Sequence, residues 1–378
     1  MIKIRRPYLI VPKLIEQPTW GGEYILKMKN WSTFNDFSGK KIGQSYELFS
    51  GSKLLLNINA STDSRFVGEL GSPDEPTVFN KTGYQENVDY VSLNEVTGLT
   101  EKIPLIKLNQ SNGNSFQLHI KKSLKDKRWL PKPETWYYFE DGLVTYGIKK
   151  GIDLEEYKKA CKKIESEMKR LSSDVKNNKL SLTDAKAKAG ELVREVNPWQ
   201  YVNTHVVKKH SVVDPSAGGI HHSWEEDLEN YPLGNVLYEI QKDVMDPVCT
   251  IRSFDKGKIK SDGSIREINV DDYFKYLDTD PEHNDIAKMT PDRAGNSLIK
   301  TSDYSLDILE LDSEVEEKTN GTFIHLFVRD GSVEVSASDG RVLVTAGHSC
   351  FIPENVLTYS IKPIGKRSVL LKAYAGRQ

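Results

Sequence analysis

Residues with metal-binding chemistry lie on three short segments of the sequence. If NSFQLHIKK is a strand, its side chains alternate, so Ser115, Gln117 and His119 share one polar face. KPETWYYFED contributes Glu134, and SAGGIHHSW contributes the adjacent pair His221 and His222. Two imidazoles, one carboxylate and one amide oxygen suit a borderline divalent ion such as Zn²⁺ and leave room for water or substrate. Taken singly, each of these residue types is more often structural. A polar strand face is also more often exposed to solvent than lined up along a ligand site.

Two basic residues raise the question of an anionic partner. Lys107 lies in IPLIKLN, where apolar neighbours make an unpaired ammonium group costly, so its side chain either extends to the surface or meets an anion. Arg252 lies in VCTIRSFD, and a guanidinium group is well shaped to bind phosphate. Both are therefore candidate contacts of an anionic substrate.

The elements that must position these residues are mostly strands. From residue 1 to about residue 148, short apolar runs alternate with turn residues, a pattern typical of an all-β structure. Asp141 and Gly142 separate two aromatic and β-branched runs, which predicts a β-hairpin because Asp-Gly supplies the positive φ angles of a tight turn. Strand patterns return at residues 201–254 and 301–375, and the last region is expected to form consecutive hairpins at its Asp-Gly pairs.

Between the first two strand regions the pattern is helical. Residues 153–198 are rich in Lys, Glu, Ala and Leu, with apolar residues at helical spacing. Asn177 and Asn178 interrupt this pattern, and Ser181, with an aspartate three residues later, is typical of a capping box that starts a second helix. The sequence therefore predicts a helical hairpin with a solvated outer face, and a further short helix at residues 270–277.

The second and third strand regions share a weak repeat. KHSVVDPSAGGIHHS aligns with GHSCFIPENVLTYSI on the pattern His-Ser-x-x-x-Pro. Six residues after the proline, the first copy has His221 and the second has Tyr359. The repeat favours duplicated barrels, of which the C-terminal one lacks the polar site residue and is expected to bind no metal.

Composition and charge exclude several function classes. A chain of 378 residues can form two or three domains. Its formal net charge of −2 supplies no basic field for nucleic acid or acidic lipid, and no stretch approaches the ~18 apolar residues of a membrane helix. The N-terminal MIKIRRPYLIVPKLI does not resemble a signal peptide, since Pro12 breaks its short apolar run. The cysteines, Cys161, Cys249 and Cys350, are too scattered to indicate a disulfide framework or a thiolate metal site. These features favour a cytoplasmic enzyme or binding protein.

Seven segments together resemble the type I phosphomannose isomerases of the cupin superfamily, in the family's order and over most of the chain. TWGGEYI resembles the family's Trp-Gly-Gly opening, KIGQSYELFSGS its Gly-Glu-x-Trp-Glu strand, and PLIKL its lysine-bearing strand. SFQLH resembles Ser-x-Gln-x-His, KPETW resembles Lys-Pro/Thr-Glu, and AGGIH resembles the Gly-x-x-His loop. GNVLYEIQ followed by TIRSFD resembles the Glu-Ile-Gln strand and its downstream arginine. Each segment alone is a weak signal, but seven in order are fairly specific.

The resemblance implies a mainly β fold of tandem cupin (jelly-roll) barrels with an inserted helical hairpin. We expect an N-terminal metal-binding cupin at residues 1–150 and 199–256, a helical insertion at 151–198, a linker with a short helix at 257–300, and a C-terminal metal-free cupin at 301–378.

The resemblance also implies a reaction and a set of site residues. The chain would interconvert mannose 6-phosphate and fructose 6-phosphate through an enediolate, whose negative charge one Zn²⁺ per chain and nearby cations would stabilise. The implied metal ligands are Gln117, His119, Glu134 and His221; the implied catalytic residues are Lys132 and Arg252; the implied substrate-binding residues are Ser115 and Lys107. The partner is then a small hexose phosphate, with no nucleic acid or membrane partner, and the chain is expected to be a monomer or small homo-oligomer. The sequence does not identify the proton-abstracting base.

The metal-binding segments depart from the family pattern at two places. Ile120 replaces the family's proline after Gln-x-His. The spacing from Pro215 to His221 is one residue longer than in the family, and strict counting from the proline falls on Ile220, which cannot bind metal. The choice between His221 and His222 therefore stays open, with His221 favoured by its spacing from the glycine.

Alternatives to this hypothesis also stay open. The extra residues KDVMDP before Arg252 leave either Asp243 or Asp246 as its acidic neighbour. A non-catalytic cupin that binds a metal or a sugar phosphate would be expected to lose Lys132 or Arg252, and both are present. A cupin enzyme could instead act on another hexose phosphate, or be an iron-dependent oxygenase, although Gln117 fits poorly with the two-histidine-one-carboxylate face of such enzymes.

Overall fold

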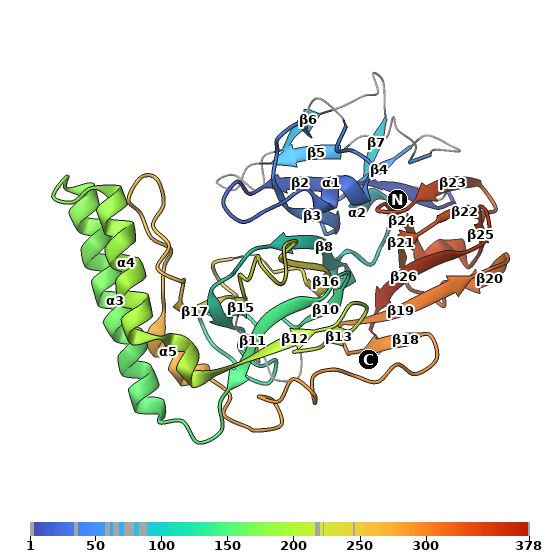
Figure 1. The fold of residues 1–378 in the computed structure, drawn as a ribbon. Coiled ribbons are helices and arrows are strands. Elements are labelled where there is room, and N and C mark those ends of the chain that lie inside the picture. The colour runs from blue at the N-terminus through green and yellow to red at the C-terminus, as the bar shows by residue number, and fades with distance from the viewer. Residues whose placement is uncertain are drawn as a thin grey trace. The chain divides into compact units, whose positions relative to one another are not determined.

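The computed structural model describes residues 4–33, 37–56, 61–62, 68–71, 79–82, 89–215, 220–221, 223–244 and 246–376, and for residues 79–82 and 220–221 it describes the backbone only. Most elements are strands, which confirms the expected mainly β, cupin-like fold (Figure 1). In the part of the chain so described, no helix is both long and apolar enough to span a membrane.

The chain forms two compact units, each built from separate stretches of sequence. Unit 1 comprises Met1–Ser111, Val236–Asp243 and Pro291–Gln378, and unit 2 comprises Asn112–Asn235 and Val244–Thr290. The boundaries of these two units differ from the expected cupin boundaries, and the cupin boundaries stay a prediction.

Unit 1 pairs strands from both ends of the chain. One sheet has the order β18-β19-β26-β21-β24-β1-β4-β7, in which Tyr8 of β1 lies opposite Phe351 of β24. A second has the order β20-β25-β22-β23, and β16, β8, β3, β2, β5 and β6 also lie side by side. The unit 1 elements are β1 (Tyr8–Val11), β2 (Lys13–Glu16), α1 (Tyr24–Met28), β3 (Ile42–Leu48), β4 (Lys53–Leu55), β5 (Gly68–Gly71), β6 (Phe79–Thr82), β7 (Tyr90–Ser92), α2 (Leu93–Val96), β8 (Pro104–Ser111), β16 (Asn235–Lys242), β18 (Ser297–Lys300), β19 (Tyr304–Leu311), β20 (Val315–Lys318), β21 (Ile324–Asp330), β22 (Ser332–Ala337), β23 (Gly340–Thr345), β24 (Ser349–Ile352), β25 (Thr358–Pro363) and β26 (Ser368–Ala375), with 3₁₀ turns at Thr100–Lys102 and Glu354–Val356.

Unit 2 combines short sheets with three helices. Its strands pair as β14-β9-β17, as β12-β11-β15, and as β10 with β13. Its elements are β9 (Phe116–Leu118), β10 (Glu134–Tyr138), β11 (Gly142–Ile148), α3 (Leu154–Lys176), α4 (Leu182–Val196), a 3₁₀ turn (Pro198–Tyr201), β12 (Val202–Val207), β13 (Val212–Val213), β14 (Ile220–His221), β15 (Ser223–Trp224), β17 (Ile251–Phe254) and α5 (Val270–Tyr276).

The hairpin predicted at Asp141-Gly142 is wrong, because its two strands pair elsewhere. β10 pairs with β13, whereas β11 pairs with β12 and β15. Asp141 instead accepts a hydrogen bond from the backbone N–H of Lys209 at 2.8 Å. Gly142 is needed for close approach, since a Cβ there would lie 2.3 Å from Oδ1 of Asn235. The Asp-Gly pair is therefore a corner between sheets.

The two Asp-Gly pairs of the C-terminal strand region, both in unit 1, divide in the same way. The strands that flank Asp330-Gly331, β21 and β22, belong to different sheets. The strands that flank Asp339-Gly340, β22 and β23, pair as a hairpin in which Ala337 lies opposite Gly340. The expected run of consecutive hairpins is therefore only partly confirmed.

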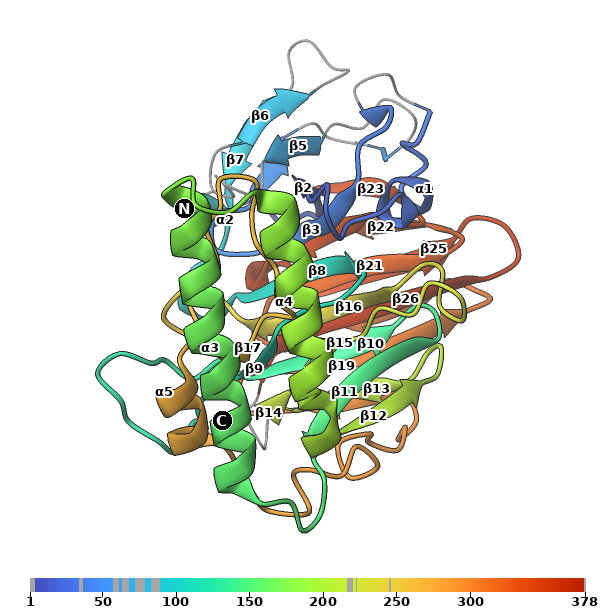
Figure 2. The same ribbon diagram turned by 60° about the vertical axis from the view of Figure 1, so that its left-hand side comes forward.

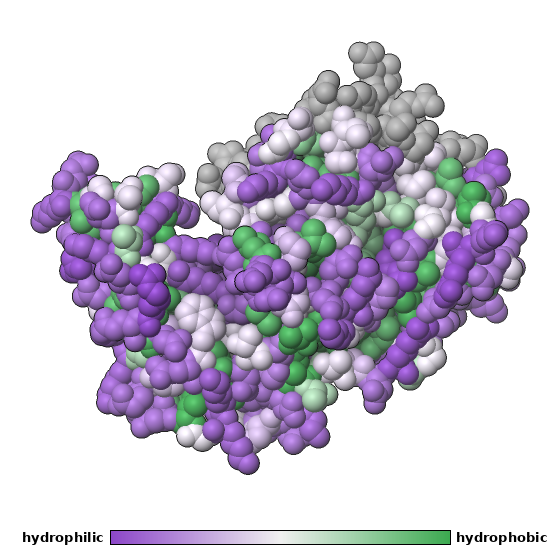
Figure 3. All heavy atoms as spheres, in the orientation of Figure 1, coloured by the Kyte–Doolittle hydropathy of each residue, from purple (hydrophilic) through white to green (hydrophobic). Residues whose placement is uncertain are grey.

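The helical hairpin is confirmed in place, and Ser181 is the N-cap of its second helix as predicted. Figures 1 and 2 show α3 and α4 side by side, and the surface visible over them is mostly hydrophilic (Figure 3). Asp153 caps α3 by accepting N–H bonds from the first turn, and Ser181 caps α4 by accepting the N–H of Asp184 at 3.0 Å. The return bond of the expected capping box differs, because the Asp184 carboxylate accepts the Ser181 hydroxyl at 2.7 Å.

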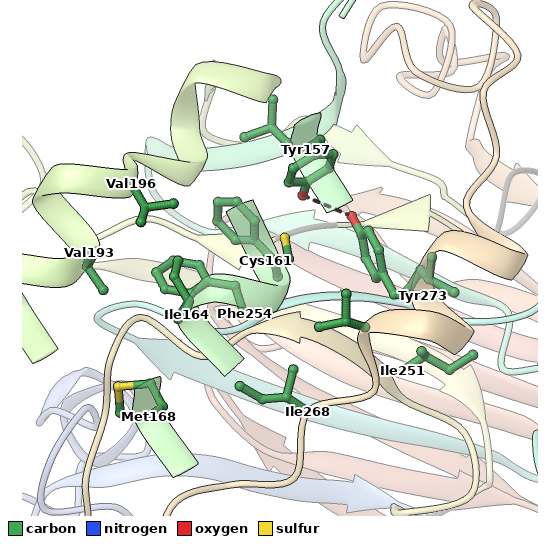
Figure 4. Close-up of a cluster of buried hydrophobic side chains, with 14 of the residues drawn as sticks. Tyr157, Cys161, Ile164, Met168, Val193, Val196, Ile251, Phe254, Ile268 and Tyr273 are labelled. Carbon is green, nitrogen blue, oxygen red and sulfur yellow. Dashed lines mark hydrogen bonds between the residues drawn. The ribbon is translucent and has the colours of Figure 1, made fainter. Parts of the chain in front are cut away.

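The inner face of the hairpin packs against the strands that carry the candidate site. Tyr157, Cys161 and Ile164 of α3 are buried in one cluster with Phe254 of β17 (Figure 4). Phe116 of β9 belongs to the same cluster. The rings of Phe116 and Phe254 meet edge to face, with centroids 5.2 Å apart. The helical insertion therefore holds β9 and β17 against each other.

Candidate metal centre

Strand β9 lies between β14 and β17 and sets the alignment of three candidate residues. Gln117 lies opposite His221 on one side and opposite Arg252 on the other. The side chain of His221, and all of His222, fall outside the described residues, so the alignment of His221 concerns its backbone alone.

Ser115 holds the Gln117 side chain. The two residues are two positions apart, so strand alternation places them on one face, as the sequence predicts. The Ser115 hydroxyl donates to Oε1 of Gln117 at 2.9 Å, and both residues are buried. The bond orients the amide oxygen that was assigned as a metal ligand.

His119 is a neutral imidazole with a lone pair on Nε2. Its Nδ1 hydrogen-bonds the backbone carbonyl of Cys249 and must donate the proton, because a carbonyl oxygen only accepts. Burial lowers the pKa of His119, and the nearby charge of Lys132 lowers it further, against the opposing effect of Glu134. Nε2 is therefore unprotonated, the form in which histidine binds metals.

Glu134 faces that lone pair. Its Oε2 lies 3.3 Å from Nε2 of His119 and 3.0 Å from Nζ of Lys132, while its Oε1 accepts the indole N–H of Trp136 at 3.0 Å. In this tautomer Nε2 presents its lone pair to the Glu134 carboxylate, so the contact brings two atoms together that can both donate an electron pair to a cation. Such a pair is stabilised by a cation, and the Lys132 ammonium group supplies one positive charge beside it.

The donor chemistry at this point fits a zinc ion. Within the described residues, no three His, Cys, Asp or Glu side chains gather closely enough to hold a metal, so an ion at His119 and Glu134 would need further ligands. Gln117 and His221 were assigned that role from the sequence. Burial raises the pKa of the Cys249 thiol to about 11, which disfavours the thiolate form that binds metals. A site of nitrogen and oxygen donors is what remains, and zinc accepts both.

Arg252 has Asp246, not Asp243, as its acidic neighbour. A guanidinium nitrogen of Arg252 lies 2.6 Å from Oδ2 of Asp246, whereas Asp243 accepts the backbone N–H of Ser50. Partial desolvation of the Asp246 carboxyl opposes its ionisation, but the charge of Arg252, a hydrogen bond from Thr250 and the charge of Lys132 together hold the pKa of Asp246 well below its usual range. The pair fixes the cation and leaves Arg252 with further N–H groups for an anion.

Lys107 is the candidate that lies in unit 1. It is buried on β8, where its ammonium group is 3.2 Å from Oε1 of Glu239, whose Oε2 accepts the Asn109 amide at 2.6 Å. A carboxylate of the protein itself therefore supplies an anionic partner for this buried lysine.

Two groups at the site were missed from the sequence. The Cys249 carbonyl orients His119, and no side-chain pattern can predict a backbone contact of this kind. Trp136 could have been found, since residues two apart on a strand share a face and Glu134 was already a candidate.

Comparisons with known proteins find similarity in structure only. No protein-family model matches the sequence, and no curated protein matches it significantly. Mannose 6-phosphate isomerase from Bacillus subtilis is similar at a TM-score of 0.60 and 14% identity, over 98% of this chain and 99% of that chain. A variant of phosphomannose isomerase from Salmonella typhimurium is similar at 0.61 and 11% identity, over 98% and 100%. A zinc-bound mannose 6-phosphate isomerase is similar at 0.60 and 12% identity, over 99% and 100%.

Identities this low establish the fold and leave the activity open, but the likeness extends over nearly the whole of both chains. This chain therefore has the fold of the mannose 6-phosphate isomerases.

Proposed function

We propose that this protein is a zinc-dependent aldose–ketose isomerase that interconverts mannose 6-phosphate and fructose 6-phosphate. The observation that carries the proposal is the convergence of His119 Nε2 and Glu134 Oε2, 3.3 Å apart, beside the Lys132 ammonium group. The fold shared with mannose 6-phosphate isomerases, one of them zinc-bound, supports the same reaction.

In this proposal Gln117, His119, Glu134 and His221 hold one zinc ion per chain. When bound, zinc supplies a Lewis acid that polarises a substrate oxygen. Two of the proposed ligands are preorganised without the metal, because the Cys249 carbonyl fixes the tautomer of His119 and Ser115 orients Gln117. Less of the binding free energy is then spent on ordering these side chains.

Cationic side chains would stabilise the charge that develops on the substrate. Isomerisation moves a proton between adjacent carbons through an enediolate, so negative charge accumulates on oxygen. Lys132 is nearly buried and 3.0 Å from Glu134, so its charge acts at short range in a poorly hydrated place. Arg252, on the strand next to Gln117, would bind the phosphate or the developing oxyanion.

The substrate's phosphate would supply binding energy away from the reacting carbons. Ser115 and Lys107 are the further proposed contacts of that group. Holding the phosphate restrains the sugar so that its first two carbons stay at the metal.

A coupled assay on purified protein of known metal content tests the proposal. We expect mannose 6-phosphate to be converted to fructose 6-phosphate, activity to fall to background after chelation, and zinc to restore it. Bound zinc without turnover of any hexose phosphate would favour a non-catalytic binding protein, and turnover that chelation leaves intact would refute the metal role.

A further inference from the structure

The indole of Trp136 binds the proposed metal ligand Glu134 on the side away from His119. Both residues lie on the same face of β10, two positions apart, and both are buried. The Trp136 N–H donates to Oε1 of Glu134 at 3.0 Å, while Oε2 faces His119 at 3.3 Å. The two carboxylate oxygens therefore have different partners.

We propose that Trp136 is a positioning residue that restricts Glu134 to one metal-binding oxygen. A carboxylate that binds a metal through both oxygens must aim one lone pair of each oxygen at the ion. Here the indole N–H takes one lone pair of Oε1 and orients the carboxylate, so that Oε2 is the oxygen presented to Nε2 of His119. This inference rests on the metal site of the proposed function.

The restriction favours zinc over larger divalent ions. Zinc takes four ligands, or five when a substrate oxygen is added, whereas calcium takes six to eight oxygens, often from bidentate carboxylates. A Glu134 held to one oxygen, together with a neutral imidazole and an amide oxygen, keeps the coordination number low. Trp136 therefore contributes to metal affinity and metal choice without touching the metal.

A second buried tryptophan provides a matched control. The rings of Trp136 and Trp224 meet edge to face with centroids 6.0 Å apart, and their exposed fractions are 2% and 7%. Among the described residues, the indole N–H of Trp224 finds no hydrogen-bond acceptor. Replacing either ring with phenylalanine removes a similar volume, but only Trp136→Phe removes a bond to Glu134.

The experiment measures metal binding directly. Zinc affinity is determined by competition with a chromogenic chelator for the wild-type chain, Trp136→Phe and Trp224→Phe. We expect Trp136→Phe to weaken zinc binding roughly ten- to a hundred-fold, the usual effect of losing a partner that orients a ligand, and Trp224→Phe to change it less than about three-fold.

The visible spectrum of the Co²⁺-substituted protein reports coordination number. Four- and five-coordinate Co²⁺ absorb more strongly than six-coordinate Co²⁺, so the wild-type chain and Trp224→Phe should give more intense bands than Trp136→Phe. If Trp136→Phe fails to fold, the wild-type spectrum still decides, because weak six-coordinate bands overturn the restriction to one oxygen.

The outcomes separate this inference from the proposed function. Equal zinc affinity and equal spectra for the two variants would overturn the role of Trp136 while leaving the metal site and the isomerase proposal intact. A wild-type chain that binds no zinc would overturn both.

Discussion

Replacing Arg252 with alanine should reduce turnover of the phosphorylated sugar selectively. Arg252 lies opposite Gln117 in the sheet and is held by Asp246 at 2.6 Å, so its charge is fixed beside the proposed metal ligands. A hydrogen bond to a charged group contributes about 1.5–3 kcal/mol, and each 1.4 kcal/mol is a factor of ten. The expected loss in kcat/KM for mannose 6-phosphate is therefore roughly ten- to a hundred-fold for one lost contact.

The structure also predicts that the Arg252→Ala variant keeps its fold and its metal. The Asp246 side chain that loses its partner is 52% exposed, so water can hydrate the freed carboxylate and the folding cost should be small. No proposed ligand is touched, so zinc content should match the wild type. A matched variant, Asp246→Asn, keeps the guanidinium but removes its anchor, and we expect a smaller loss of kcat/KM than for Arg252→Ala.

The assay compares mannose 6-phosphate with unphosphorylated mannose on variants of confirmed zinc content. If Arg252 binds the phosphate, turnover of mannose, where measurable, should fall far less than that of the phosphorylated sugar. An equal loss on both sugars would refute the phosphate role and make Arg252 a contact of the reacting end. A loss of folded protein with no change in selectivity would make it structural.

Four further predictions concern the metal, the paired histidines, the core and the pH dependence. Metal analysis should find close to one zinc per chain, and a chain active without any divalent metal would contradict the site. His221→Ala should abolish zinc retention while His222→Ala should not; the reverse result would shift the ligand by one residue. Phe254→Ala should cost about 3–5 kcal/mol, because it opens a cavity between the helical hairpin and β9, and should lower the urea midpoint of the helical circular-dichroism signal; a cost below 1 kcal/mol would contradict this role of the core. Burial lowers the pKa of His325 to about 3, so below pH 6.5 the unfolded chain binds a proton that the folded chain does not, and stability falls as the pH falls. At pH 5 this amounts to about 2 kcal/mol, which His325→Gln should abolish in urea titrations compared between pH 7 and pH 5; an unchanged pH dependence would count against a neutral buried imidazole.

Local sequence determined the features that depend on neighbouring residues. Helix periodicity and the capping residue Ser181 predicted α3 and α4 closely, because a helix satisfies its hydrogen bonds within itself. Strand alternation predicted that Ser115 and Gln117 share a face, and the same rule covers Glu134 and Trp136.

Strand partners were decided only by the tertiary structure. Asp-Gly closes a hairpin at Asp339-Gly340 but forms a corner at Asp141-Gly142, since both fit a sharp turn and only distant strands determine which sheet comes next. The aspartate that neighbours Arg252 was left open for the same reason, and the fold of the loop before β17 selects Asp246.

The central contact of the candidate site also depends on the tertiary structure. His119 and Glu134 are 15 residues apart, and the sequence offered them as candidates on separate segments, joined by their donor chemistry and by a family resemblance. Their approach to 3.3 Å depends on the Cys249 carbonyl, a backbone group 130 residues from His119 that carries no side-chain signal. Local sequence therefore determines which donors are available, whereas long-range strand pairing determines where their lone pairs meet, because the contacts that orient them come from segments that are adjacent only in the folded chain.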